Sequence, residues 1–222
     1  MKNNKPMIIS FVLSILNLIA TLIYIPTLPD TVPTHFDVNW KVDAVGSKWT
    51  MLVPAFLPLL VSLGILLELK LRKKDYPNRK PLQITMLILT IFFICVNIFL
   101  LWSIQGGAVI GAKMEHMPHM GYLLILAFGL LFIAMGNFFP TITPNKTLGI
   151  KISWTLNNEQ CWKLTHRFGG KVFVIAGFLL VLIDVIAMIA GLSPEWLLII
   201  FMVILMAVFV ITSVYAYQHR ND

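Results

Sequence analysis

The chain has 222 residues, of which 58% are apolar and 12% are charged, and its mean hydropathy is +0.85. Soluble domains carry about 25% charged and about 45–50% apolar residues, so this composition excludes an ordinary water-soluble enzyme and a disordered chain. The formal net charge of +7 does not indicate a nucleic-acid partner, because the basic residues lie between long apolar runs, where they orient helices in a membrane.

Six apolar runs are each long enough to cross a bilayer, which takes about 20 helical residues. They lie at residues 7–28, 51–69, 82–102, 120–139, 172–190 and 196–217. The first run follows two lysines, as a signal peptide does, but it is too long and lacks a small-residue cleavage site, so we expect it to stay in the mature protein. The sequence predicts an all-α, polytopic integral membrane protein with six transmembrane helices.

The distribution of Lys and Arg predicts the orientation. Fourteen of the 17 lie in the N-terminus, in residues 70–81, in residues 140–171 and in the C-terminal tail, whereas three lie in the alternate segments. Because positive residues are retained in the cytoplasm, both termini are predicted to be cytoplasmic. The segments that then face outward are 29–50, 103–119 and 191–195.

Polar residues recur along one face of the first and third spans. They are spaced by three or four residues in the first span and by seven in the third, which aligns them on one side of each helix. The two stripes are Ser10, Ser14, Asn17, Thr21 and Tyr24, and Gln83, Thr90 and Asn97. We expect these faces to contact protein.

The fifth span carries a stripe of small residues together with a buried acid. Gly170, Gly177, Asp184 and Gly191 share one face, and glycine stripes let helices approach closely. An ionisable group in the membrane usually belongs to a proton or ligand pathway, which is one interpretation of Asp184. The other is a carboxyl that hydrogen-bonds to a neighbouring helix through a partner such as Asn17 or Asn97.

The Met- and His-rich segment 114–120 offers the ligand types that copper prefers, and its candidate ligands are His116, Met117 and His119. The segment lacks the fixed spacing of a zinc site, so we expect a solvated loop and neither a metal nor another cofactor. The sequence also has no H-E-x-x-H, G-x-S-x-G or Walker motif and predicts no enzyme activity.

Two polar segments carry recognisable signatures. Residues 28–37 read LPDTVPTHFD and continue through Asp43, Gly46, Ser47 and Lys48, and they resemble the proline-and-histidine signature of an uncharacterised bacterial membrane domain that often precedes SdpI-type proteins. Residues 149–156 read GIKISWTL; Trp162 and THRFGGK at 165–171 follow. This pattern resembles the SdpI family, the immunity proteins for a secreted sporulation-delaying toxin. The sequence departs from the family pattern at Ser153, where proline is usual, and at Trp40, where glycine is common.

The resemblance implies a bacterial plasma-membrane protein that gives resistance to a secreted antimicrobial peptide. It also implies signalling, because the best-known member sequesters a transcriptional repressor when toxin is present. The implied partners are the lipid bilayer, a peptide toxin and a cytoplasmic helix-turn-helix repressor. The candidate site residues are His35, Asp37 and Asp43 in the outer loop; Lys151, Trp154, Thr155, Trp162, Thr165, His166 and Arg167 in the cytoplasmic signature; and Asp184, Asn17 and Asn97 within the membrane.

We predict two domains, a two-helix N-terminal unit (1–70) with the outer loop 29–50, and a four-helix SdpI-like unit (71–222) with the signature segment 140–171. Asn157 and Gln160 form a predicted capping box for a short amphipathic helix before the fifth span, with Trp162 at the membrane interface. Ser193 is the predicted N-cap of the last span.

Two other function classes remain open at this point. A small ion-coupled transporter would use Asp184 and the polar faces of the first and third spans as its pathway. A membrane enzyme would need hydrolytic chemistry for which the sequence shows no motif.

Overall fold

The structure, a computed structural model, describes residues 4–73, 75–108 and 118–222. Six of its helices are long and apolar enough to cross a membrane, which confirms the six predicted spans. The helices are α1 (Lys5–Tyr24), α2 (Leu52–Leu71), α3 (Arg79–Ala108), α4 (Pro118–Phe138), α5 (Ser153–Asn157), α6 (Glu159–Ile189) and α7 (Glu195–Gln218), with the 3-10 turns η1 (Ile25–Thr27), η2 (Lys48–Met51) and η3 (Phe139–Thr141).

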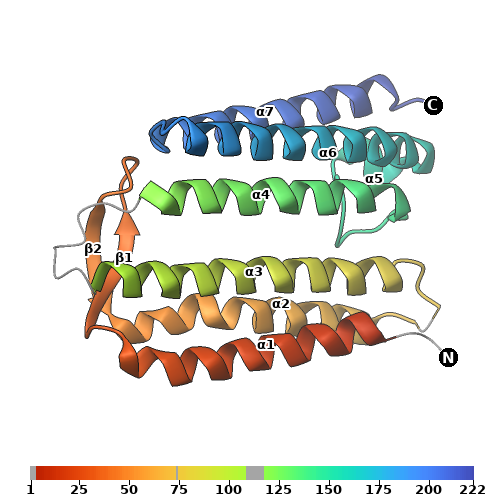
Figure 1. Cartoon of the computed structure of the whole chain (residues 1–222). Coiled ribbons are helices and arrows are strands. Elements are labelled where there is room, and N and C mark those ends of the chain that lie inside the picture. The colour runs from red at the N-terminus through yellow and green to blue at the C-terminus, as the bar shows by residue number, and fades with distance from the viewer. Residues whose placement is uncertain (1–3, 74, 109–117) are drawn as a thin grey trace.

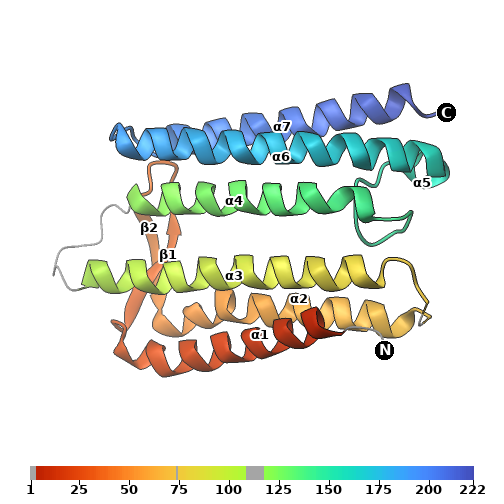
Figure 2. The same cartoon turned by 45° about the vertical axis from the view of Figure 1, so that its right-hand side comes forward.

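The long helices form two groups that run side by side (Figures 1 and 2). α1, α2 and α3 pack together, as do α4, α6 and α7, and α3 packs against α4 between the groups. The N- and C-terminal ends lie at the same end of the bundle, as an even number of spans requires. The boundary predicted after residue 70 stays a prediction, and α3 lies with the N-terminal pair.

The predicted outer loop contains a β-hairpin, which the all-α prediction did not include. Strands β1 (Thr31–Phe36) and β2 (Val42–Ser47) pair antiparallel, with Thr31 opposite Ser47 and an irregular register between Pro33 and Phe36. Because Pro33 interrupts the short β1 and alternation is weak, the sequence pattern gave little strand signal. The hairpin lies at the end of the bundle opposite the termini (Figure 1), and Val32 anchors it among Ile25, Leu28, Met51, Leu101 and Ile104.

Trp40 ends the turn of this hairpin in a backbone conformation that favours glycine. Its φ is +58°, the left-handed region that costs a residue with a side chain about 1–2 kcal/mol. The ring is buried and packs against Phe99 and Leu100 of α3 and Leu124 of α4. This conformation gives a physical reason for the glycine common there in the family. In this chain the tryptophan also connects the two helix groups.

The glycine stripe of the fifth span is confirmed as a close helix contact at Gly170 and Gly177, whereas Gly191 follows the end of α6 and an added Cβ there would meet nothing within 4 Å. A Cβ atom placed on Gly177 would lie 2.6 Å from the carbonyl oxygen of Gly129, and one on Gly170 would lie 2.6 Å from that of Gly136. Both pairs join α6 to α4 seven residues apart. Only glycine at these positions allows the two backbones to approach so closely.

Three local predictions need correction. The segment before the fifth span is the start of one continuous helix, α6, and Asn158 caps it by accepting hydrogen bonds from the backbone N–H groups of Gln160 and Cys161. Trp162 is fully buried and does not reach the membrane interface. The last span begins at Glu195 with Pro194 as N-cap, and no side chain caps it.

The orientation is testable by accessibility. We expect a membrane-impermeant thiol reagent to label Ala44→Cys in intact cells and to leave Asp75→Cys unlabelled until the cells are opened, because the exposed Ala44 is on the hairpin and the exposed Asp75 follows α2. Both variants are made after replacing Cys95 and Cys161. The reverse labelling pattern would place the termini outside.

Candidate functional site

Two of the three outer-loop candidates come together on the hairpin. His35 on β1 pairs with Ala44 of β2, and its side chain reaches the neighbouring Asp43, with His35 Nδ1 2.6 Å from Asp43 Oδ1. Both side chains are exposed. Exposed pairs contribute little to stability, at most about 1 kcal/mol, so this pair is free to contact a ligand without unfolding the hairpin.

Asp37 has a structural role in the turn. Its carboxylate accepts backbone N–H hydrogen bonds from Asn39 (2.8 Å) and Lys41 (2.9 Å). The hydrogen bond from Lys41 is the main reason that the pKa of Asp37 lies below its usual range. Asp37 therefore shapes the loop that presents His35 and Asp43.

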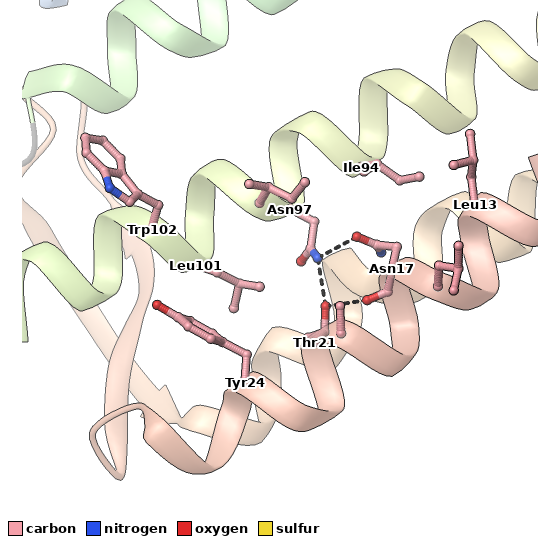
Figure 3. A pocket seen from close by; sticks show the side chains of 11 residues that line it. Leu13, Asn17, Thr21, Tyr24, Ile94, Asn97, Leu101 and Trp102 are labelled. Atoms are coloured by element: carbon pink, nitrogen blue, oxygen red, sulfur yellow. Dashed lines mark hydrogen bonds between the residues drawn. The ribbon is translucent and has the colours of Figure 1, made fainter.

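The polar faces of the first and third spans meet inside the helix group α1–α3, as the sequence predicts. Asn97 Nδ2 donates to Asn17 Oδ1 (3.1 Å) and to Thr21 Oγ1 (2.9 Å) (Figure 3). Asn17 Nδ2 donates to the Ala55 carbonyl of α2 (3.1 Å). Nearer the end of the bundle where the termini lie, Ser62 of α2 joins the three helices again. Its Oγ lies 3.3 Å from Ser14 Oγ of α1 and 3.3 Å from Thr90 Oγ1 of α3. These bonds hold three helices in one register.

A groove of about 480 Å³ lies between α1 and α3 beside this network (Figure 3). Apart from Asn17, Thr21 and Asn97 its lining is almost entirely apolar or aromatic: Leu13, Leu16, Ala20, Tyr24, Ile94, Ile98, Leu101 and Trp102. Asn97 is fully buried, and its Oδ1 has no hydrogen-bond partner within the described residues. The groove thus has mostly apolar walls, as many binding sites do, and the acceptor that lacks a donor is buried beside it.

Asp184 does not bond to the polar network. It lies in α6, whereas Asn17 and Asn97 bond each other in the other helix group. The contacts Gly129–Gly177 and Gly136–Gly170 fix the antiparallel register of α4 and α6, and this register places Asp184 opposite Tyr122. The Tyr122 hydroxyl donates to the Leu192 carbonyl. Asp184 is buried, and its Oδ1 finds no partner in the part of the chain that the structure describes. The predicted bond to Asn17 or Asn97 is therefore wrong.

The absence of a hydrogen-bond partner for Asp184 Oδ1 among the described residues predicts how substitutions of Asp184 affect the stability of the protein. Because no hydrogen bond to Asp184 is lost and an unpaired buried polar group costs about 1–3 kcal/mol, Asp184→Leu should raise the melting temperature of the purified protein. Asp184→Asn should leave it near the wild-type value. A lower melting temperature for the leucine variant would show that the carboxyl stabilises the fold.

The predicted cytoplasmic signature is built around His166. Its Nε2 accepts a hydrogen bond from the Ile150 backbone N–H (2.9 Å), so its Nδ1–H donates to the Trp162 carbonyl (2.9 Å). Trp162 stacks on the imidazole at 4.0 Å between ring centroids, and its Nε1–H donates to the Ile142 carbonyl (2.7 Å). Gly149, with φ +116°, lies where any side chain would collide with His166.

Four of the seven signature candidates are buried and hold this segment together. Thr155 donates to the Ile150 carbonyl (2.8 Å), and Thr165 lies beside Cys161, with Oγ1 3.9 Å from Sγ. His166 and Trp162 hold residues 149–155 against α6 through Ile150, whereas the contact of Thr165 lies within α6. Lys151 and Arg167 are exposed and Trp154 is partly exposed, so these three remain available at the surface.

The metal candidates cannot be placed. His116 and Met117 lie outside the described residues, and the side chain of His119 is not described either. Elsewhere, in residues 4–73, 75–108 and 118–222, no group of three or more His, Cys, Asp or Glu residues is arranged to hold a metal ion.

Comparisons with known proteins agree with both signatures. Residues 141–215 match the SdpI/YfhL protein family, and residues 12–60 match a domain of unknown function (DUF1648). With the six spans, these matches define a multi-pass bacterial membrane protein. The match of segment 141–215 to the SdpI/YfhL family model confirms the resemblance drawn from the sequence.

The chain is also similar to a curated protein along nearly its whole length. It is 24% identical over 215 residues to the immunity protein SdpI of Bacillus subtilis (strain 168), covering 97% of this chain and 96% of that protein. No solved structure matches the chain.

Proposed function

We propose that this protein is a plasma-membrane immunity protein that protects the cell from a secreted peptide toxin. The observation that carries the proposal is the similarity to immunity protein SdpI, which runs through both signatures and all six spans. No catalytic step is needed for this role.

The outer face offers the toxin a contact surface. The exposed pair His35–Asp43 lies on a hairpin that also exposes Val38 and Val45, with Trp49 just beyond it. A surface that combines a hydrogen-bonded His–Asp pair with exposed apolar side chains suits an amphipathic peptide. The groove between α1 and α3 opens in the membrane below the same hairpin.

The proposal is tested by protection of a sensitive bacterium that expresses this chain. Wild-type protein should allow growth in purified sporulation-delaying toxin, the peptide that the family resemblance implies. His35→Ala and Asp43→Asn should lower the tolerated toxin concentration about tenfold at matched membrane levels, as loss of one charge-assisted contact predicts.

Asp30→Asn is the matched control, since it removes another exposed outer carboxylate, the partner of Lys48. It should protect like the wild type. Failure of the wild-type protein to protect would refute the immunity function, whereas unchanged protection by both hairpin variants would refute the role of the hairpin alone.

We further propose that the surface around Lys151 and Trp154 sequesters a cytoplasmic repressor when toxin is bound. Lys151 is exposed, and Trp154 packs edge-on against Tyr217 of α7, so a movement of α7 would reach this surface directly. A Lys151→Glu variant should retain protection and lose toxin-dependent recovery of the repressor in the membrane fraction. Equal recovery with both proteins would contradict the proposal.

The geometry favours this function over a transporter. The polar network lies within α1–α3, whereas Asp184 lies in α6 among apolar side chains of the α4–α6–α7 group. A pathway that uses both would have to pass between the two helix groups.

A further inference from the structure

Two cations on α6 have no carboxylate partner among the described residues, although other cations of the chain, among them their neighbour Lys163, do have one. One turn earlier Lys163 binds Glu159 (2.8 Å), and on α2 Glu68 binds Arg72 (2.7 Å). Arg167 and Lys171, which follow Lys163 at intervals of four residues, form no ion pair within the described part of the chain. Their charges point to an anion from outside the protein.

These two cations line a hollow of about 420 Å³ between α6 and the end of α4. The close contact of Gly136 with Gly170 lies in the hollow, so no side chain from these positions fills it. From the α4 side Asn137 contributes a side-chain amide, one of whose hydrogens is donated to the Ile133 carbonyl (3.0 Å) while the other is free to bind a ligand.

The position of the hollow along α6 suits a lipid. Arg167 and Lys171 directly precede the apolar run that crosses the membrane, at the end of the bundle where the termini lie. On the membrane side of the same hollow Val174 and the exposed Ile175 provide an apolar wall. The cations thus lie at headgroup level and the apolar wall at the level of the acyl chains.

We propose that this hollow binds the phosphate of an anionic phospholipid. The guanidinium of Arg167 matches two phosphate oxygens, Lys171 adds a second positive charge, and the Asn137 amide donates one more hydrogen bond. The acyl chain lies along Val174 and Ile175. A soluble phosphate would meet the same cations without gaining the apolar wall, so the lipid is the favoured source of this group.

The test measures lipid retention by the full-length protein. Protein purified in detergent is titrated with phosphatidylglycerol or with phosphatidylcholine of the same acyl chains, and bound lipid is counted by native mass spectrometry. We expect selective binding of phosphatidylglycerol and, for the double variant Arg167→Gln/Lys171→Gln, a loss of affinity on the order of tenfold.

The control double variant Lys146→Gln/Lys163→Gln removes the same net charge from the same predicted side of the membrane but leaves the hollow intact. It should keep the wild-type affinity, and both variants should retain the wild-type melting temperature in lipid-free detergent. An equal loss in both double variants would overturn the site, because the effect would then reflect net charge alone.

A competition arm separates the two sources of phosphate. Soluble glycerol phosphate should not displace the lipid at concentrations that saturate an exposed phosphate site. Displacement would overturn the lipid assignment in favour of a soluble phosphate. Toxin protection is not part of this test, so its outcome is independent of the proposed immunity function.

Discussion

Gly177→Ala is expected to lower the stability of the folded protein by about 1–3 kcal/mol, the usual cost of forcing an extra carbon into a packed interior. The new Cβ would lie 2.6 Å from the Gly129 carbonyl oxygen, which is backbone and cannot rotate away. α4 and α6 would have to separate. Since helices in a membrane associate through close van der Waals packing, separation loses contacts along the whole interface.

The matched control is Gly64→Ala in α2, where an added Cβ meets nothing within 4 Å. There the substitution should be neutral or stabilising by up to about 1 kcal/mol, because alanine is the better helix former. The two variants are compared by thermal unfolding in the same detergent. A melting temperature for Gly177→Ala equal to that of Gly64→Ala would show that α4 and α6 do not touch at Gly129.

The same close contact illustrates what the sequence could predict. The six spans depend on the length of apolar runs, and the polar and glycine stripes depend on spacing within one helix. The spans and the polar stripes are confirmed, and the glycine stripe is confirmed at Gly170 and Gly177. The partner of each stripe depends on how separate helices assemble. For that reason the expectation that Asn17 and Asn97 face protein is confirmed, while one of the two interpretations of Asp184, a hydrogen bond to either of them, is wrong.

The hairpin and the signature show a second limit. Trp40 takes a left-handed conformation because it closes a turn and packs against two helices. The sequence signal for the strands is weak because a proline and a register shift interrupt their alternation. In the signature, residue type predicted an aromatic and cationic surface. Contacts between residues as far apart as 150 and 166 instead bury Trp162 and His166 and leave Lys151 exposed.

That burial makes Trp162 the side chain whose removal should cost the most. Trp162→Ala is expected to destabilise the protein by about 3–5 kcal/mol, as for other large buried aromatic residues. The substitution removes the stacking partner of His166 and leaves the Ile142 carbonyl without its donor. Trp162→Phe keeps an aromatic ring beside His166 but loses the N–H donor, so it should cost only about 1–3 kcal/mol.

Trp154→Ala is the control, because Trp154 belongs to the same signature but is only partly buried, with its ring edge-on to Tyr217. It should change stability least of the three. Membrane abundance and melting temperature are measured together with protection against the toxin. If Trp162 acts as part of the scaffold, protection by Trp162→Ala should fall only in proportion to the amount of folded protein, and expression at matched levels should restore it. A Trp162→Phe protein that is stable, abundant and unable to protect would instead show that the indole itself takes part in immunity.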